Sequence, residues 1–96
     1  MVFVRLEIDR HMVKSYTLVR VKPPKDAEIY QKVLKLPEVK EVIMTYGEYD
    51  LMVQVEVKSL DDLDNFVFSK LRTIEGVEAT TTLLVAAPPG AGGRDD

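Results

Sequence analysis

The residues that could do chemistry gather within residues 44–55, where two apolar, β-rich runs meet at a Gly-Glu-Tyr-Asp corner. Gly47 can adopt a positive φ at no steric cost, so we expect a tight hairpin turn here. Such a turn presents free backbone N–H groups beside the carboxylate of Asp50 and the phenol rings of Tyr46 and Tyr49. A small zwitterion such as an amino acid needs a carboxylate for its ammonium, donors for its carboxylate and an apolar wall. The corner therefore suits a ligand of this kind.

Each of these residues also has a purely structural interpretation, which the sequence leaves open. Gly47 could serve only as a turn glycine, and Asp50 could only accept hydrogen bonds from the turn backbone, as aspartate often does beside a hairpin. Tyr46 and Tyr49 could be packing residues of an interface. A binding role for Asp50 requires its carboxylate to pair with a ligand ammonium.

Catalytic chemistry finds little support in the chain. It has no cysteine and one histidine, His11, and it lacks a Ser/His/Asp set, a phosphate loop and metal-ligand spacing. A short acidic cluster is better explained as a helix N-terminal charge preference than as a metal site: Asp61, Asp62 and Asp64. We expect no catalytic residue, no metal and no cofactor. The rival interpretation is a small cofactor-independent dimeric α+β barrel enzyme of the monooxygenase or isomerase type, which would need a polar pocket under the sheet.

Charge and hydropathy exclude two classes of partner. The 96 residues carry a net charge of −3, and Lys and Arg are scattered among Asp and Glu. A nucleic-acid-binding protein should show a basic face, so we expect no direct nucleic-acid contact. No apolar run approaches the ~20 residues of a membrane span, and no signal peptide is visible. A cytoplasmic protein with no membrane partner is the expectation.

Hydrophobic periodicity predicts six elements. We expect strands over residues 16–22, 39–46, 51–57 and 77–86, a helix from Asp26 to Pro37, and a second helix from Leu60 that Gly76 ends as its C′ residue. Ser59 resembles the first residue of a capping box for the second helix. The order β-α-β-β-α-β is that of the α+β ferredoxin-like fold, an antiparallel four-stranded sheet with two helices on one face.

The face of the sheet away from the helices is expected to be an interface. If the third strand turns Leu51, Val53, Val55 and Val57 toward the helices, Met52 points to the open face. Alternation from Val77 places three residues of the last strand on that open face: Thr80, Thr82 and Leu84. A small domain with an apolar open face is marginal alone, so we expect at least a dimer. The expected interface residues are Leu18, Met52 and Leu84.

The chain divides into one domain and two ends. Residues 15–86 form the expected ferredoxin-like domain, because all six elements fall there. Residues 1–14 are an N-terminal extension, read either as an extra strand or as a segment left by cloning. Residues 87–96 have the composition of a disordered tail, rich in Pro, Gly and Ala.

Three stretches carry a resemblance to a known family. They are Pro-Glu-Val-Lys-Glu-Val at 37–42, Gly-Glu-Tyr-Asp-Leu at 47–51, and Ile-Glu-Gly-Val-Glu-Ala-Thr-Thr-Thr-Leu-Leu at 74–84. Together they resemble the C-terminal effector-binding domain of the Lrp/AsnC transcriptional regulators, also called the RAM domain. The resemblance covers nearly all of residues 15–86.

The resemblance implies a function as well as a fold. It implies dimers formed through the sheets, often assembled into rings of four dimers, with amino acids bound between dimers. Carried onto this chain, it implies ligand contacts at Gly47, Tyr49, Asp50, Thr80 and Thr82. Full regulators have an N-terminal helix-turn-helix, for which the residues before Tyr16 are too few, so we expect the stand-alone form. The expected function is a non-catalytic amino-acid-binding and oligomerisation module of transcriptional regulation, acting by self-assembly or with full-length DNA-binding relatives.

Overall fold

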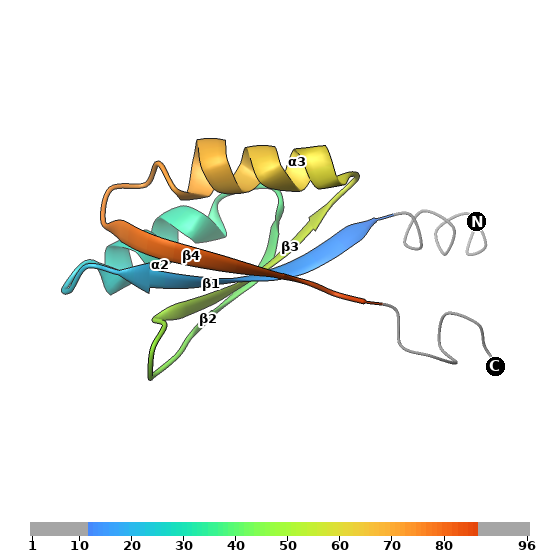
Figure 1. Ribbon diagram of the computed structural model, residues 1–96. Coiled ribbons are helices and arrows are strands. Elements are labelled where there is room, and N and C mark those ends of the chain that lie inside the picture. The colour runs from blue at the N-terminus through green and yellow to red at the C-terminus, as the bar shows by residue number, and fades with distance from the viewer. Residues whose placement is uncertain (1–11, 87–96) are drawn as a thin grey trace.

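A computed structural model describes residues 12–86, which fold as a four-stranded antiparallel sheet with its helices on one face (Figure 1). The elements are β1 (Val13–Val21), α2 (Asp26–Leu34), β2 (Val39–Met44), β3 (Leu51–Val57), α3 (Leu60–Asn65), the π-helical segment η1 (Phe66–Leu71) and β4 (Val77–Leu84). The predicted ferredoxin-like β-α-β-β-α-β order is confirmed. The predictions made for residues 1–11 and for the tail 87–96 lie outside the described residues.

The core lies between the helices and one face of the sheet. On β3, alternate residues from Leu51 to Val57 are buried, as the alternation predicts. Antiparallel pairing places the buried side chains of β1 on the same face, because Val19 lies opposite Leu51 and Thr17 opposite Val53. Helix α2 contributes Ile29, and the second helix contributes the residues listed last: Leu63, Phe66, Val67 and Leu71. Both helices therefore cover the same face.

The sequence predicted the start of the second helix correctly but not its end. Its start is as predicted, since the Ser59 hydroxyl accepts the backbone N–H of Asp62 at 3.0 Å. Its end is not, because the helix stops at Leu71 and Gly76 is not its C′ residue. Just beyond this end, the hydroxyl of Thr73 donates to the carbonyls of Ser69 and Lys70.

Gly76 belongs instead to the turn that enters β4. Its φ is +102°, and its carbonyl accepts the backbone N–H of Lys22 at 2.8 Å. A Cβ at this position would lie 2.9 Å from Ile29 Cδ1 and 2.9 Å from Lys25 Cδ. The glycine therefore serves both the positive φ and the close approach of α2.

An irregularity in β4 reverses the predicted orientation of its side chains. Val77 pairs with Val21, but Ala79 pairs with Arg20, so Glu78 is an extra residue in the strand. Beyond this bulge, the residues on the helix side are Thr80, Thr82 and Leu84, opposite Val19, Thr17 and Ser15. The expectation that these three face the open side is therefore wrong, and Leu84 does not lie on the predicted interface. The open side carries Ala79, Thr81 and Leu83 instead.

The other two predicted interface residues lie where the sequence places them. Leu18 on β1 pairs with Met52 on β3, and both alternate with buried neighbours, so both point to the open face. Met52 also pairs with Ile43 on β2. Among residues 12–86, no helix is long and apolar enough to cross a membrane.

Candidate functional site

The corner between β2 and β3 is a closed loop that projects from one end of the sheet (Figure 1). The backbone N–H of Thr45 donates to the carbonyl of Asp50 at 2.9 Å, and the Thr45 hydroxyl donates to the carbonyl of Tyr49 at 2.8 Å. Gly47 has a φ of +111°, and no atom lies within 4 Å of the Cβ it lacks. Its predicted role as a turn glycine with positive φ is confirmed, and the reason is backbone conformation rather than space.

The carboxylate of Asp50 is engaged by the neighbouring strand. Its Oδ2 atom accepts the backbone N–H of Val21 at 2.8 Å, and its own N–H donates to the carbonyl of Val19 at 2.8 Å. The side chain thus continues the hydrogen bonding between β1 and β3 past the first residue of β3. This contact supports a structural role for Asp50. Its carboxylate accepts a hydrogen bond from the backbone of β1, however, and not from the backbone of the turn.

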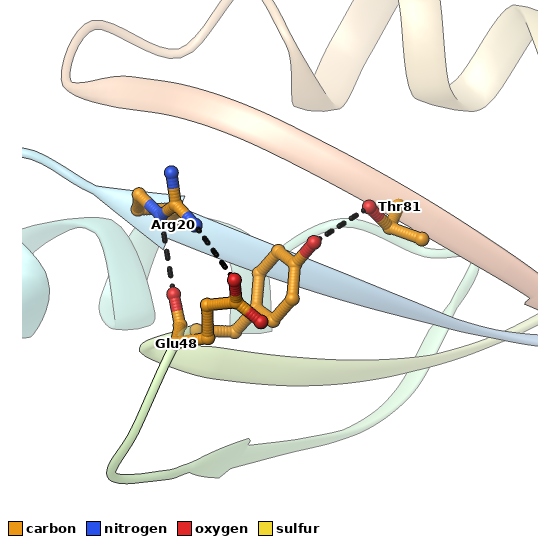
Figure 2. Close-up of polar contacts among 4 residues, drawn as sticks. Arg20, Glu48 and Thr81 are labelled. Atoms are coloured by element: carbon orange, nitrogen blue, oxygen red, sulfur yellow. Dashed lines mark hydrogen bonds and ion pairs between the residues drawn. The ribbon is translucent and has the colours of Figure 1, made fainter.

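Tyr49 crosses the open face of the sheet. Its phenol oxygen lies 2.9 Å from the hydroxyl of Thr81 on β4, so the ring passes over β1, which lies between β3 and β4. The guanidinium of Arg20, also on the open face, lies over the ring with its carbon 5.4 Å from the ring centroid. Figure 2 shows Arg20, Glu48 and Thr81 around this ring. The loop is therefore tied to both β1 and β4.

Arg20 is bound to Glu48 in two ways (Figure 2). Its Nε donates to the backbone carbonyl of Glu48 at 3.1 Å, and its Nη2 lies 4.0 Å from Glu48 Oε2. The two side chains are 43% and 80% exposed, and an ion pair this open and this long contributes little to stability. No other hydrogen bond or ion pair to residues 12–86 holds the terminal nitrogens of Arg20.

The structure brings together only part of the predicted ligand set. Gly47, Tyr49 and Asp50 share the loop, and Tyr49 faces the open side of the sheet. Thr80 and Thr82 lie on the helix side, where the hydroxyl of Thr82 is 3.1 Å from that of Thr17. Their ligand-binding role stays a prediction. Tyr46 is fully exposed.

Sequence reasoning did not select three residues of this cluster: Arg20, Glu48 and Thr81. Arg20 carries a usable signal, because strand alternation places it on the same face as Leu18. Thr81 carries none, since its orientation depends on the bulge at Glu78. Glu48 lies inside the Gly-Glu-Tyr-Asp corner, where its partner on β1 cannot be read from local sequence.

The fold defines a ferredoxin-like domain, and comparison with known proteins gives its family. The family model described as the Lrp/AsnC ligand binding domain matches residues 1–89. The chain therefore belongs to the Lrp/AsnC family, and the resemblance found in the sequence is confirmed.

Relatives of known name are transcriptional regulators. The HTH-type transcriptional regulator FL11 of Pyrococcus furiosus is 38% identical over 73 residues, which are 76% of this chain and 48% of that protein. The chain spans about half the length of the curated relatives it matches.

Solved structures agree with the fold. The crystal structure of FFRP-DM1 matches with a TM-score of 0.75 at 39% identity, over 77% of this chain and 99% of that chain. The L-Met complex of a Neisseria meningitidis transcriptional regulator matches with a TM-score of 0.71 at 25% identity, over 77% of this chain and 49% of that chain.

Proposed function

We propose that this chain is a non-catalytic, amino-acid-responsive module of transcriptional regulation that acts through assembly. The observation that carries the proposal is the loop at residues 45–50, placed within a matched Lrp/AsnC ligand binding domain. The loop is held by its own hydrogen bonds and by the contact of Tyr49 with Thr81, and Arg20 of β1, which contacts Glu48 of the loop, lies over the Tyr49 ring. Such a set suits a small zwitterion. The L-Met complex of the Neisseria relative supports an amino acid as the ligand class.

The open face of the sheet supports the assembly part of the proposal. Its apolar side chains come from all four strands: Leu18, Ile43, Met52 and Leu83. Ile43 and Leu83 are among the exposed large hydrophobic residues. Burying such a face against a second copy removes apolar surface from water at roughly 25 cal/mol per Å². The partner would be another copy of this chain, or the matching domain of a full-length DNA-binding relative.

The direct test is a binding screen of the purified chain. Each of the twenty common L-amino acids is titrated by isothermal calorimetry and by thermal shift. We expect saturable binding of one or a few of them, with stabilisation of about 2.7 kcal/mol at a hundredfold excess over Kd. Tyr49→Ala should weaken that binding, whereas Tyr46→Ala, three residues away in the same loop and fully exposed, should not. Absence of saturable binding by any of the twenty would refute the ligand class.

The purified chain also tests whether DNA binding requires a DNA-binding relative. The net charge is −3, and Lys and Arg are scattered among Asp and Glu along the sequence, whereas phosphate binding is supplied by clustered cations. We expect no shift of duplex DNA in a gel with this chain alone. Salt-sensitive retardation of DNA by this chain alone would contradict the proposal.

A further inference from the structure

A cavity of about 310 Å³ lies at the end of the sheet away from the loop at residues 45–50. The turn before β2, the end of β3 and α3 form its wall, to which they contribute Pro37, Val57 and Asn65. A strand of the length of β3 spans roughly 20 Å, so the cavity is separate from the loop. None of the four apolar residues named above for the open face belongs to this wall.

Glu38 brings to this wall a carboxylate with one oxygen unpaired. Lys70 Nζ donates to its Oε2 at 2.6 Å, whereas Oε1 is buried and has no hydrogen-bond partner among residues 12–86. A buried carboxylate oxygen without a donor is costly. The terminal torsion of a glutamate side chain is broad, so a small rotation can turn Oε1 toward a donor in the cavity while Lys70 keeps its hydrogen bond. Glu38 thus offers an acceptor that no described group of the chain uses.

Asp62 of α3 supplies a second carboxylate to the same wall. Its backbone N–H donates to the Ser59 hydroxyl, but within the described part of the chain no hydrogen bond or ion pair engages its carboxylate oxygens. Two elements far apart in the sequence therefore each present an acceptor to one cavity.

The charge of the wall favours a cation. Three of its residues carry carboxylates and one, Lys58, carries an ammonium group. The third carboxylate, that of Glu56, alternates onto the open face opposite Lys14, so it adds negative potential and we assign no contact to it. In residues 12–86 no group of side chains is placed to hold a metal ion, so the cation that suits this cavity is organic.

We infer that the cavity binds a small organic cation with a guanidinium group, whose donors bridge the Asp62 carboxylate and Oε1 of Glu38. An alkylguanidinium holds five N–H donors in one plane and can serve two carboxylates at once, whereas an ammonium group is a compact point charge. Its alkyl stem lies against Pro37 and Val57, the apolar part of the wall. This inference goes beyond the proposed function, because it gives the domain a second ligand site that joins the turn before β2 to α3.

The probe for this site is n-butylguanidinium, which carries the group and a short stem but is not a zwitterion. It is titrated into the isotope-labelled chain and followed by the amide signals in NMR spectra. We expect saturable shifts at Val57 and Asn65 and none at Tyr49. The neutral analogue n-butylurea has the same shape and should bind roughly tenfold or more weakly, since it lacks the charge of the hydrogen-bonded pair.

Variants of neighbouring aspartates assign the contact. Asp62→Asn should bind n-butylguanidinium roughly tenfold or more weakly than the wild type. The matched control is Asp61→Asn, because Asp61 lies in the same first turn of α3, is exposed and is not part of the wall. Glu38→Gln should weaken binding as well. Circular dichroism verifies the fold of each variant, and Asp62→Asn carries the test if Glu38→Gln fails to fold.

Each outcome decides the inference. Weaker binding by Asp62→Asn with unchanged binding by Asp61→Asn supports it. Equal loss in both variants would show a general charge effect and overturn it, as would equal affinity for n-butylurea or no saturable shift with the wild type. Tyr49→Ala, which the proposed function expects to weaken amino-acid binding, should bind n-butylguanidinium as the wild type does. Failure of this inference and failure of the proposed function are therefore seen separately.

Discussion

The Oδ2 atom of Asp50 lies 2.8 Å from the backbone nitrogen of Val21, so a side-chain carboxylate accepts the hydrogen bond that a strand carbonyl would otherwise accept. The contact joins the start of β3 to the end of β1, and it lies directly beside the candidate binding loop. Asp50 therefore helps to hold the loop in position.

Asp50→Ala should consequently destabilise the fold. Removing the acceptor leaves the partly buried N–H of Val21 unpaired, and we expect a loss of about 1–3 kcal/mol in the free energy of unfolding. Urea denaturation followed by circular dichroism measures it. Asp50→Asn keeps an acceptor oxygen and should lose less, and Glu48→Ala, in the same loop, should stay within about 0.5 kcal/mol of the wild type. Unchanged stability of Asp50→Ala would show that the Val21 contact has no structural importance.

The two glycines with positive φ should respond differently to alanine. At Gly47 no atom lies near the missing Cβ, so Gly47→Ala should cost only the backbone strain, about 1–2 kcal/mol. At Gly76 the same strain is joined by contacts of 2.9 Å, one of them to the buried Ile29, so Gly76→Ala should cost about 1–3 kcal/mol more. Urea unfolding of the two variants compares the costs. Equal losses of stability would mean that the side chains of α2 near Gly76 move aside at little cost.

Adjacent leucines at the end of β4 offer a matched test of the interface. Leu83 and Leu84 are 52% and 54% exposed, but Leu83 lies on the open face and Leu84 on the helix side. Leu83→Lys should split a dimer formed through the open face, because it places a charge in an apolar contact, and Leu84→Lys should leave the dimer intact. Light scattering at micromolar concentration measures the mass. The reverse result would place the interface on the other face, and a monomeric wild type would remove it altogether.

The ion pair of Glu38 with Lys70 should make stability depend on pH. Burial raises the pKa of the Glu38 carboxyl, but the 2.6 Å hydrogen bond from Lys70, a backbone hydrogen bond and the Lys70 charge outweigh burial and hold the pKa below its ordinary 4.5. A pKa lowered by folding adds stability that is fully present above the unfolded value and is lost as the pH falls through the folded value.

Lys70→Met tests this dependence. The variant should be less stable than the wild type by about 1 kcal/mol at neutral pH, because both partners are partly exposed, and the difference should shrink as the pH falls below 4.5. Urea unfolding from pH 7 to pH 3 follows it. Lys32→Met, whose partner Glu28 is solvent-exposed, is the control and should change stability less. A difference that stays constant with pH would assign the loss to packing of the lysine stem.

The sequence predicted the elements better than their faces. Residues 51–57 form β3 at both predicted ends, because strict alternation of apolar and polar side chains fits a strand with one buried face. The Ser59 cap was equally predictable, since a cap is a contact over three residues. The faces of β4 were not, because a bulge at Glu78 is a property of the backbone pairing and no glycine or other residue marks it.

In the candidate site, too, local features could be predicted from the sequence and contacts between distant residues could not. Gly47 and its positive φ could be predicted because a turn is local. The link from Tyr49 to Thr81 joins residues on non-adjacent strands, and it depends on the same bulge that sequence alternation missed. The engagement of Asp50 by Val21 likewise needs the β1–β3 register, which composition and periodicity do not supply.

The strand order β2-β3-β1-β4 also has a consequence for the chain as it is synthesised. Of the strands within residues 12–86, β1 is synthesised first and lies inside the sheet, and one of its two neighbours, β4, is synthesised last. Until Leu84 has left the ribosome, β1 has an unpaired edge whose N–H and C=O groups can pair with a strand of another nascent chain. Because this closure joins distant parts of the sequence, it is also expected to be a slow step in folding. The arrival of β4 thus covers the edge of β1 and makes β4 itself the edge strand on that side of the sheet.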